Sequence, residues 1–452
     1  MTHKYQNKLH PFTETPNRTF FVLSVPVLFS LIAEPVTGLV DTAFISRLGA
    51  EPLAALGVGT AALSGIFWVF NFLGVGSQTE VGQAFGRNEQ NRAREMGSLS
   101  LLMGLAFGVL LILIGWWLIS PIAAVMGAEQ RVFDHAVEYM QLRLLGAPAV
   151  LVTIAAFGIL RGLQEMRIPL WIAVGVNVMN VILDAVLIYG AGPFPAMGVA
   201  GAALASTISQ WTGATLAVWM VFNRLGITRR LRLADARRLF QIGGDMFVRT
   251  GLLLLYLVLT TRAATRISAD AGAAHQAIRQ VWTFAAMLLD SFAITAQSLT
   301  AFFIGLKSFS QVRQVARVAC IWSIVTGFFL MGLMLAGQHW VIQLLVPETA
   351  IKSFVTAWLI AAIAQPINSL AFATDGIHWG TGDYGYLRNA MIVATGSGVL
   401  GLALIDLNTD AAFNIVWWVT ALWILIRGVL GIIRIWPGIG NSPFRVGAKK
   451  TD

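Results

Sequence analysis

FFVLSVPVLFSLIAEPVTGLVDTAFIS, residues 20–46, is an apolar stretch that is longer than the roughly 20 residues a helix needs to cross a bilayer. It is too long for a signal-peptide core and lacks a cleavage site, so we expect it to be retained as a first span. The whole chain of 452 residues is similar, with 57% hydrophobic and 12% charged residues and a mean hydropathy of +0.72. Soluble domains carry about twice that share of charge. This composition excludes a soluble or disordered chain and predicts a helical membrane protein.

Apolar runs of spanning length follow one another along the chain, at residues 20–46, 53–80, 97–119, 137–160, 169–190, 197–222, 245–265, 276–304, 318–337, 354–378, 387–406 and 412–434. The basic residues test this assignment, because cytoplasmic loops are enriched in Lys and Arg. With the N-terminus in the cytoplasm, 23 of the 31 Lys and Arg residues fall on the cytoplasmic side, including the last five from Arg427 to Lys450, and 5 fall outside. We therefore predict an all-α protein of twelve transmembrane helices with both termini in the cytoplasm.

The most basic stretch, NRLGITRRLRLADARRL at residues 223–239, divides the chain into halves. We predict an N-lobe at 1–222, a linker at 223–242 that rests on anionic headgroups rather than nucleic acid, and a C-lobe with a basic tail at 243–452. The halves resemble each other: RLGAEPLAA (47–55) aligns with RISADAGAA (266–274) at an offset of 219. An offset of 218 aligns three further pairs, Pro148 with Pro366, Gly158 with Gly376, and Gly162 with Gly380. Such duplication is typical of secondary transporters with a site between the repeats.

Four aspartates fall inside predicted spans, where an ionisable residue is a functional hypothesis by default: Asp41, Asp184, Asp290 and Asp375. Glu34 lies two helical turns before Asp41, so the two carboxyl groups are predicted to share a face. Asn177, Asn180 and Asp184 form a polar stripe on one helix. Polar residues can also serve only to link helices, and this remains an alternative for Asn177 and Glu34.

Two kinds of chemistry suit a carboxyl group in a span. Burial disfavours the charged form, so such a group can exchange a proton. Alternatively, oxygen atoms of Asp41, Asn180 and Asp184 can coordinate a hard cation such as Na⁺. The sequence leaves both open, and it predicts no cofactor and no catalytic residue. Pro26 and Pro35 each remove a helical hydrogen bond and permit a bend in the span that carries Asp41.

Several stretches together resemble the multidrug and toxic compound extrusion (MATE) family, and within it the DinF-like branch. They cover nearly the whole chain: GLVDTAFISRLGAEPLAALG (38–57), QAFGRNEQNRA (83–93), RGLQEMRIPL (161–170), NVILDAVLIYG (180–190), GVAGAALASTISQ (198–210), LLDSFAITAQSL (288–299) and ATDGIHWGTGDYGYLRNA (373–390). The resemblance implies a V-shaped pair of six-helix lobes in the bacterial inner membrane. It implies a monomer that exports small organic, often cationic or amphipathic, compounds in exchange for H⁺ or Na⁺, with those compounds and membrane lipids as partners.

The resemblance also implies roles for individual residues. It assigns ion coupling to Asp41, Asn180 and Asp184, joined by a hydroxyl from the sixth span that maps to Thr207, and bending of the first span to Pro26. Asp290 and Asp375 match acidic positions of the second lobe. The sequence departs from the family after Asp375, where His378 and Trp379 replace a more apolar stretch and are expected to tune substrate choice. For Trp379 the alternative is an aromatic residue at a helix end near the headgroups.

Three rival functions fit parts of the pattern. Gly380-Thr-Gly-Asp383 has the form used by intramembrane aspartyl proteases, but charge counting places Asp383 in a cytoplasmic loop. A lipid flippase of the same superfamily is the main alternative, although the spans offer only Arg143, Arg249 and Arg279 for its cavity. A passive channel would not need the intramembrane carboxyl groups.

Overall fold

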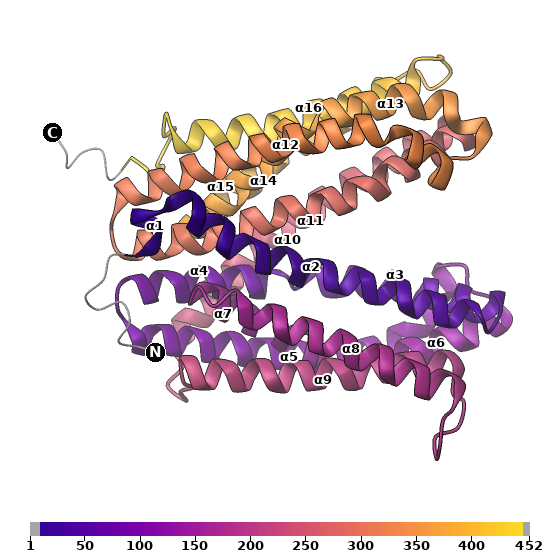
Figure 1. Cartoon of the computed structure of the whole chain (residues 1–452), viewed down its shortest axis with the longest axis horizontal. Helices are drawn as coiled ribbons and strands as arrows, with labels where there is room; N and C mark the ends of the chain where they lie inside the picture. Colours follow the sequence, from indigo (N-terminus) through magenta and orange to yellow (C-terminus); the bar gives the residue numbers. More distant parts are fainter. Residues whose placement is uncertain (1–9, 446–452) are drawn as a thin grey trace. The chain divides into compact units, whose positions relative to one another are not determined.

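The computed structural model describes residues 10–445, and in this part of the chain the regular elements are helices. They form two units, one comprising Val25–Gly243 and the other residues 10–24 together with 244–445 (Figure 1). Helices α2 (Pro16–Ser46) and α10 (Leu233–Ile267) each pass from one unit to the other along their length. The two crossing points, after residue 24 and after residue 243, are separated by the same 219 residues that separate the sequence repeats.

The first unit is a bundle of long helices that begins with most of α2, which runs from Pro16 to Ser46. The helices that follow are α3 (Ala50–Val69), α4 (Phe72–Gly86), α5 (Gln90–Val125), α6 (Gln130–Leu144), α7 (Ala147–Gly162), α8 (Arg167–Tyr189) and α9 (Gly198–Arg224). The predicted linker does not stay irregular over its length. Its last ten residues form the start of α10, and an ion pair of Asp235 with Arg92 (2.5 Å) ties this start to α5.

The second unit contains the short helix α1 (Pro11–Glu14) and most of α10 (Leu233–Ile267). Its other helices are α11 (Ala269–Gly305), α12 (Phe309–Leu345), the 3₁₀ turn η1 (Glu348–Ala350), α13 (Ile351–Ile363), α14 (Gln365–Thr381), α15 (Tyr384–Ala403) and α16 (Ala412–Ile435). The long helices and the bent helix pair therefore follow one another in the same order in both units.

The observed helices match the predicted spans one for one. Over residues 10–445, eight segments are long and apolar enough to cross a membrane alone, with α3 and α4 counted together, and the bent pairs α6–α7 and α13–α14 raise the number to ten. The two remaining predicted spans are α9 and α15, which are less apolar but have 27 and 20 residues. Both are long enough to span a bilayer.

Prolines explain the two bent pairs. Pro148 lies in the first turn of α7 and Pro366 in the first turn of α14, and the axes bend there by 48° and 46°. Proline cannot donate the backbone hydrogen bond that would continue the preceding helix, so each pair breaks at its proline. The aligned prolines of the sequence repeat thus mark equivalent bends.

The aligned glycines allow equivalent close helix crossings. In the first unit a Cβ atom on Gly162 would lie 2.7 Å from the Gln78 carbonyl oxygen, and in the second unit a Cβ on Gly380 would lie 2.6 Å from that of Gln297. Gly158 and Gly376, one turn earlier, meet the backbones of α4 and α11 even more closely. Small residues four apart let membrane helices approach backbone to backbone.

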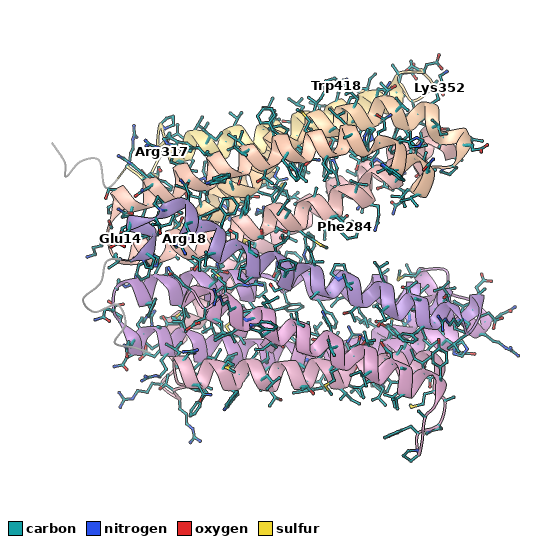
Figure 2. All side chains as sticks on the ribbon, viewed as in Figure 1. Glu14, Arg18, Phe284, Arg317, Lys352 and Trp418 are labelled. Atoms are coloured by element: carbon teal, nitrogen blue, oxygen red, sulfur yellow. The ribbon has the colours of Figure 1, made fainter. Side chains whose placement is uncertain are left out.

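Basic side chains mark the two ends of the second unit. Figure 2 shows Arg18 and Arg317 at one end of this unit and Lys352 at the other. The sequence predicts the first two on the cytoplasmic side and Lys352 outside, so the basic residues separate along the helices as the topology requires.

Candidate ion-coupling site

A cluster of ionisable side chains lies inside the first unit. Asp41 comes from α2, Tyr139 and Arg143 from α6, and Asn180 and Asp184 from α8. We call these five residues the first-lobe cluster. Asp184 is fully buried, and Asn180 and Asp41 are 3% and 9% exposed. Tyr139 and Arg143 are one turn apart on α6, and Asn180 and Asp184 are one turn apart on α8. Each helix therefore presents both of its side chains on one face.

Asn180 connects the cluster to α9. When its amide oxygen accepts from the Ser206 backbone N–H at 3.2 Å, its nitrogen donates to Asp41 Oδ1 at 3.3 Å. This orientation gives each end of the amide a suitable partner. Asn180 therefore holds the Asp41 carboxyl group next to α8.

The carboxyl group of Asp184 lies beside that of Asp41, and the Arg143 guanidinium acts electrostatically on both. Tyr139 is within range of the same three charges. Both oxygen atoms of Asp184 are buried, and within residues 10–445 no N–H or hydroxyl group donates to either, so the group that faces them is the Asp41 carboxyl. Two carboxylates that share a site and one cation repel each other, so a proton or a bound cation would stabilise the pair.

Two residues predicted for this site, Thr207 and Glu34, are not part of the first-lobe cluster. The hydroxyl of Thr207 donates to the Leu142 carbonyl oxygen at 2.9 Å, so it joins α9 to α6, and Ser206 is the α9 residue that meets Asn180. Glu34 is exposed on α2, whereas Asp41 is buried. The spacing of seven residues leaves the two carboxyl groups two turns apart, about 10.5 Å along the axis of α2, so they do not meet.

Pro26 and Pro35 both lie inside α2, which remains one continuous helix over 31 residues. Pro26 is buried and lies two residues after the point where α2 passes between the units. Each proline lacks the backbone N–H that would otherwise hold the helix straight. The helix that carries Asp41 therefore has two positions at which bending breaks no backbone hydrogen bond.

The predicted acidic residues of the second unit have different surroundings. Arg249 of α10 and Arg427 of α16 both donate to Oδ2 of Asp375 on α14, the latter at 2.9 Å. All three side chains are buried. Asp290 also acts electrostatically on Arg427. Unlike Asp184, Asp375 is thus neutralised by two guanidinium groups.

Tryptophans cover the same arginines. The Arg249 guanidinium lies over Trp379 at 5.1 Å from the ring centroid, and Arg427 lies over Trp423 at 4.6 Å. Cation–π contacts of this kind strengthen when water is excluded. Trp379 therefore packs inside the second unit. This residue, at which the sequence departs from the family, stabilises the buried guanidinium group of Arg249.

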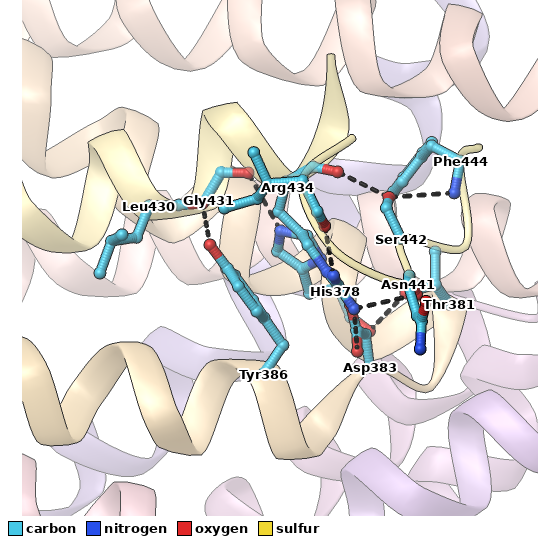
Figure 3. Close-up of polar contacts among 11 residues, drawn as sticks. His378, Thr381, Asp383, Tyr386, Leu430, Gly431, Arg434, Asn441, Ser442 and Phe444 are labelled. Atoms are coloured by element: carbon cyan, nitrogen blue, oxygen red, sulfur yellow. Dashed lines mark hydrogen bonds and ion pairs between the residues drawn. The ribbon is translucent and has the colours of Figure 1, made fainter. Parts of the chain in front are cut away.

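His378 and the Gly380–Asp383 motif belong to a separate network near the end of α14 (Figure 3). His378 Nε2 lies 3.1 Å from the Gly431 carbonyl oxygen, and Asp383 forms an ion pair with Arg434 at 2.8 Å. Gly382 ends α14 in the left-handed conformation, which glycine adopts without strain. The first unit has an equivalent pair, Glu165 with Arg224 at 3.6 Å. The Gly-Thr-Gly-Asp motif is thus explained by a repeated helix-end ion pair.

Sequence reasoning missed some of the polar residues described above. It grouped Arg427 with the cytoplasmic tail, and that assignment was wrong, because the structure buries Arg427 within α16 beside Asp375. The signal was available: Arg427 is the only basic residue in the apolar run 412–433. Tyr139 and Ser206 carried no comparable signal, since isolated hydroxyl groups are common in spans.

The duplicated bundle, its bent helix pairs and its intramembrane carboxyl cluster define a secondary-transporter type of membrane protein. The MatE family model matches residues 26–186 and 246–404, and the chain belongs to this family of transporters, which are not enzymes. The chain is 30% identical to DNA damage-inducible protein F of Escherichia coli (strain K12), over 94% of this chain and 93% of that protein.

Two further comparisons agree with this assignment. The chain is 28% identical to Protein DETOXIFICATION 44, chloroplastic, of Arabidopsis thaliana, over 94% of this chain and 82% of that protein. Among solved structures, a MATE protein crystallised in a bent conformation has a TM-score of 0.87 and 18% identity, over 98% of this chain and 99% of that one. The similarity extends over both units.

Proposed function

We propose that this protein is a secondary antiporter that exports small organic compounds, often cationic or amphipathic, in exchange for H⁺ or Na⁺. The coupling ion binds at Asp41 and Asp184, with Asn180 positioning Asp41. Alternating access exposes the site to each side of the membrane in turn. Pro26 and Pro35 permit the bending of α2 that this exchange requires.

One observation supports placing the coupling in the first lobe. The Asp184 carboxyl group is fully buried beside Asp41, and within residues 10–445 no guanidinium or other N–H group donates to it, whereas Asp375 accepts from both Arg249 and Arg427. A group that is already neutralised by two fixed cations gains little from a proton or Na⁺. The pair in the first lobe gains an opposite charge when either ion binds.

The site is compatible with either ion. Asp41 and Asp184 supply carboxylate oxygen atoms for Na⁺, which prefers such hard ligands, while the Asn180 amide nitrogen holds Asp41 in place. The same two carboxyl groups can instead share one proton. In either state a cationic substrate competes with the ion for the negative charge, and this competition is the basis of antiport.

The proposal includes a location and an assembly state. We place the chain in the bacterial inner membrane as a multi-pass monomer with both termini in the cytoplasm. The separation of Arg18 and Arg317 from Lys352 within the second unit supports this orientation (Figure 2). We further propose that the lobes comprise residues 1–222 and 243–452, joined by the basic linker at 223–242.

Dye efflux from proteoliposomes tests the proposal. A proton gradient and a sodium gradient are imposed separately on vesicles with the purified protein, with Asp41→Asn, and with Asp134→Asn as a control that removes an exposed carboxylate from α6. We expect one gradient to drive efflux by the wild type and the control but not by Asp41→Asn. Equal efflux by Asp41→Asn would contradict coupling at this site.

The alternative function, flipping of a lipid, is tested in the same vesicles with a labelled lipid. Flippases of this superfamily are expected to use cavity arginines, but here Arg249 is neutralised by Asp375, and Arg143 lies beside two carboxyl groups. Transfer of the lipid without any transfer of dye would replace the proposed antiport by lipid flipping.

A further inference from the structure

A second cluster of polar side chains lies in the second unit, away from Asp375. It consists of Thr261 on α10, His275, Arg279 and Trp282 on α11, and Trp417 on α16, and we call it the outer cluster. Arg279 donates to Thr261 Oγ1 at 2.8 Å, and His275 Nε2 lies 3.3 Å from the same oxygen. The Trp417 ring is 5.3 Å from both the His275 and the Trp282 rings, centroid to centroid. These contacts make it a single compact group.

The outer cluster lies toward the end of the second unit that carries Lys352. Asp270, at the start of α11, accepts a hydrogen bond at 2.7 Å from Thr349, three residues before Lys352. Arg279 is eight residues from the middle of the 37-residue helix α11, or about 12 Å along its axis. With that middle at the bilayer centre, Arg279 lies inside the hydrocarbon core, which extends roughly 15 Å to each side.

The charge of the outer cluster is not balanced. Arg279 is half-buried, and within residues 10–445 it makes no ion pair and no acidic side chain acts on it or on His275. This contrasts with Arg249 and Arg427, which share Asp375. An arginine in a span without a counter-charge is costly and marks a functional site by default.

The cluster also has hydrogen-bond donors without acceptors. The indole nitrogens of Trp282 and Trp417 are buried, and neither has a hydrogen-bond partner in the described part of the chain. Indole groups can only donate, so Trp282 and Trp417 each lack an acceptor, and the hydrogen bond of Arg279 among the described residues goes to the neutral Thr261 hydroxyl. Nδ1 of the buried His275 is unpartnered among the described residues as well. Buried polar groups in native proteins are nearly always satisfied, by a ligand or water where the chain itself provides nothing.

We propose that the outer cluster binds an organic anion, meaning a carboxylate, sulfonate or phosphate group carried on an aromatic or apolar body. The oxyanion accepts from Arg279 and from the two indole N–H groups, and it supplies the missing negative charge. Trp282, which is half-buried like Arg279, offers its ring to the apolar body. This site is separate from the first-lobe cluster and does not depend on which ion couples there.

Equilibrium dialysis of the purified full-length protein in phosphatidylcholine nanodiscs tests the proposal. The probe is 2-naphthalenesulfonate, and 2-naphthol is its uncharged counterpart. Arg279→Gln is compared with Arg262→Gln, which removes an exposed positive charge from the same end of α10. We expect saturable binding of the sulfonate to the wild type and to Arg262→Gln, with at least about a tenfold loss of affinity in Arg279→Gln.

Trp282→Phe and Trp417→Phe keep an aromatic ring and remove one N–H each, so they test the site even if Arg279→Gln does not fold. We expect each to weaken sulfonate binding severalfold. Nanodiscs with added phosphatidylglycerol separate two sources of the anion: displacement of the sulfonate indicates a lipid headgroup, and undiminished binding indicates a free organic anion. Failure of the wild type to bind the sulfonate, equal affinity in all variants, or equally tight binding of 2-naphthol would overturn the proposal.

Discussion

The carboxyl groups of this protein differ chiefly in how their charge is balanced. Two carboxyl groups, those of Asp41 and Asp184, have one guanidinium group within range. The single carboxyl group of Asp375 accepts hydrogen bonds from two guanidinium groups. Burying an ion pair gives little net stability, but removing one partner leaves a charge that the interior cannot solvate. Substitutions at the two sites should therefore fail in different ways.

Asp375→Asn should destabilise the protein without abolishing ion coupling. It leaves Arg249 and Arg427 buried without their shared counter-charge, a loss of about 3–5 kcal/mol of unfolding free energy. Thermal unfolding in detergent measures the loss, with Asp134→Asn as the matched carboxylate control. The fraction that inserts into vesicles should still respond to the same ion gradient as the wild type. A stable Asp375→Asn protein that has lost its gradient response would place the coupling in the second lobe.

Asn180→Ala should weaken the coupling ion rather than the fold. The variant loses the hydrogen bond to Asp41 Oδ1, and a bond to a charged group contributes about 1.5–3 kcal/mol. The ion concentration for half-maximal efflux should rise about tenfold or more. Asn177→Ala, one turn earlier on α8, is the control and should behave as the wild type. An identical shift in both variants would mean that Asn180 has no special role.

For single residues, the sequence predicts the candidate polar residues better than it predicts which of their side chains come into contact. Asp41, Asn180 and Asp184 are predicted because charged and amide groups are rare in apolar runs, and the structure brings these three side chains together. Thr207 and Ser206 are adjacent hydroxyl residues, so only the rotation of α9 decides which one faces Asn180. Arg427 was misplaced because its run could be ended before or after it, and the partner that fixes its depth is 52 residues away.

At the scale of helices, the sequence repeat has a direct physical meaning. Its aligned prolines bend α6–α7 and α13–α14, and its aligned glycines let α7 cross α4 and let α14 cross α11. These features were predictable because proline and glycine act through the backbone, and their effect depends little on distant contacts. The break between α3 and α4 had no such signal, and it was predicted as one uninterrupted run.

Gly376→Ala should destabilise the second lobe. The new Cβ would meet the Ala293 backbone, which cannot move without shifting α11. Overpacking of this kind costs typically about 1–3 kcal/mol. Gly396→Ala on α15 is the control, because its Cβ would have no neighbour within 4 Å, and alanine favours the helix. Thermal unfolding of the two variants should differ clearly, and equal melting temperatures would contradict the close crossing.

At the scale of the whole molecule, composition and the placement of basic residues predicted the number and order of the spans. They could do so because the bilayer imposes one length and one charge rule on every segment. The position of the lobe boundary depends on packing instead. Parts of α2 and α10 pack with the opposite half of the sequence, and no local pattern indicates this exchange.

The predicted orientation is open to a labelling test in intact cells and inverted vesicles. Cys320 is buried, so the wild type should resist a membrane-impermeant maleimide, and Cys320→Ala provides a clean background. On that background Arg229→Cys should be labelled only from the cytoplasmic side and Lys352→Cys only from outside. Labelling of both from one side would contradict the three spans, an odd number, that are predicted between them.

The most direct test of the central claim is ion release by the purified protein when substrate is added. Proton-selective and sodium-selective electrodes record the release in weakly buffered detergent solution, for the wild type, Asp184→Asn and Asp134→Asn. We predict that substrate releases one of the two ions from the wild type and from Asp134→Asn. Asp184→Asn should bind the substrate without releasing either ion. Release of neither ion by the wild type, or undiminished release by Asp184→Asn, would contradict coupling through the first-lobe cluster.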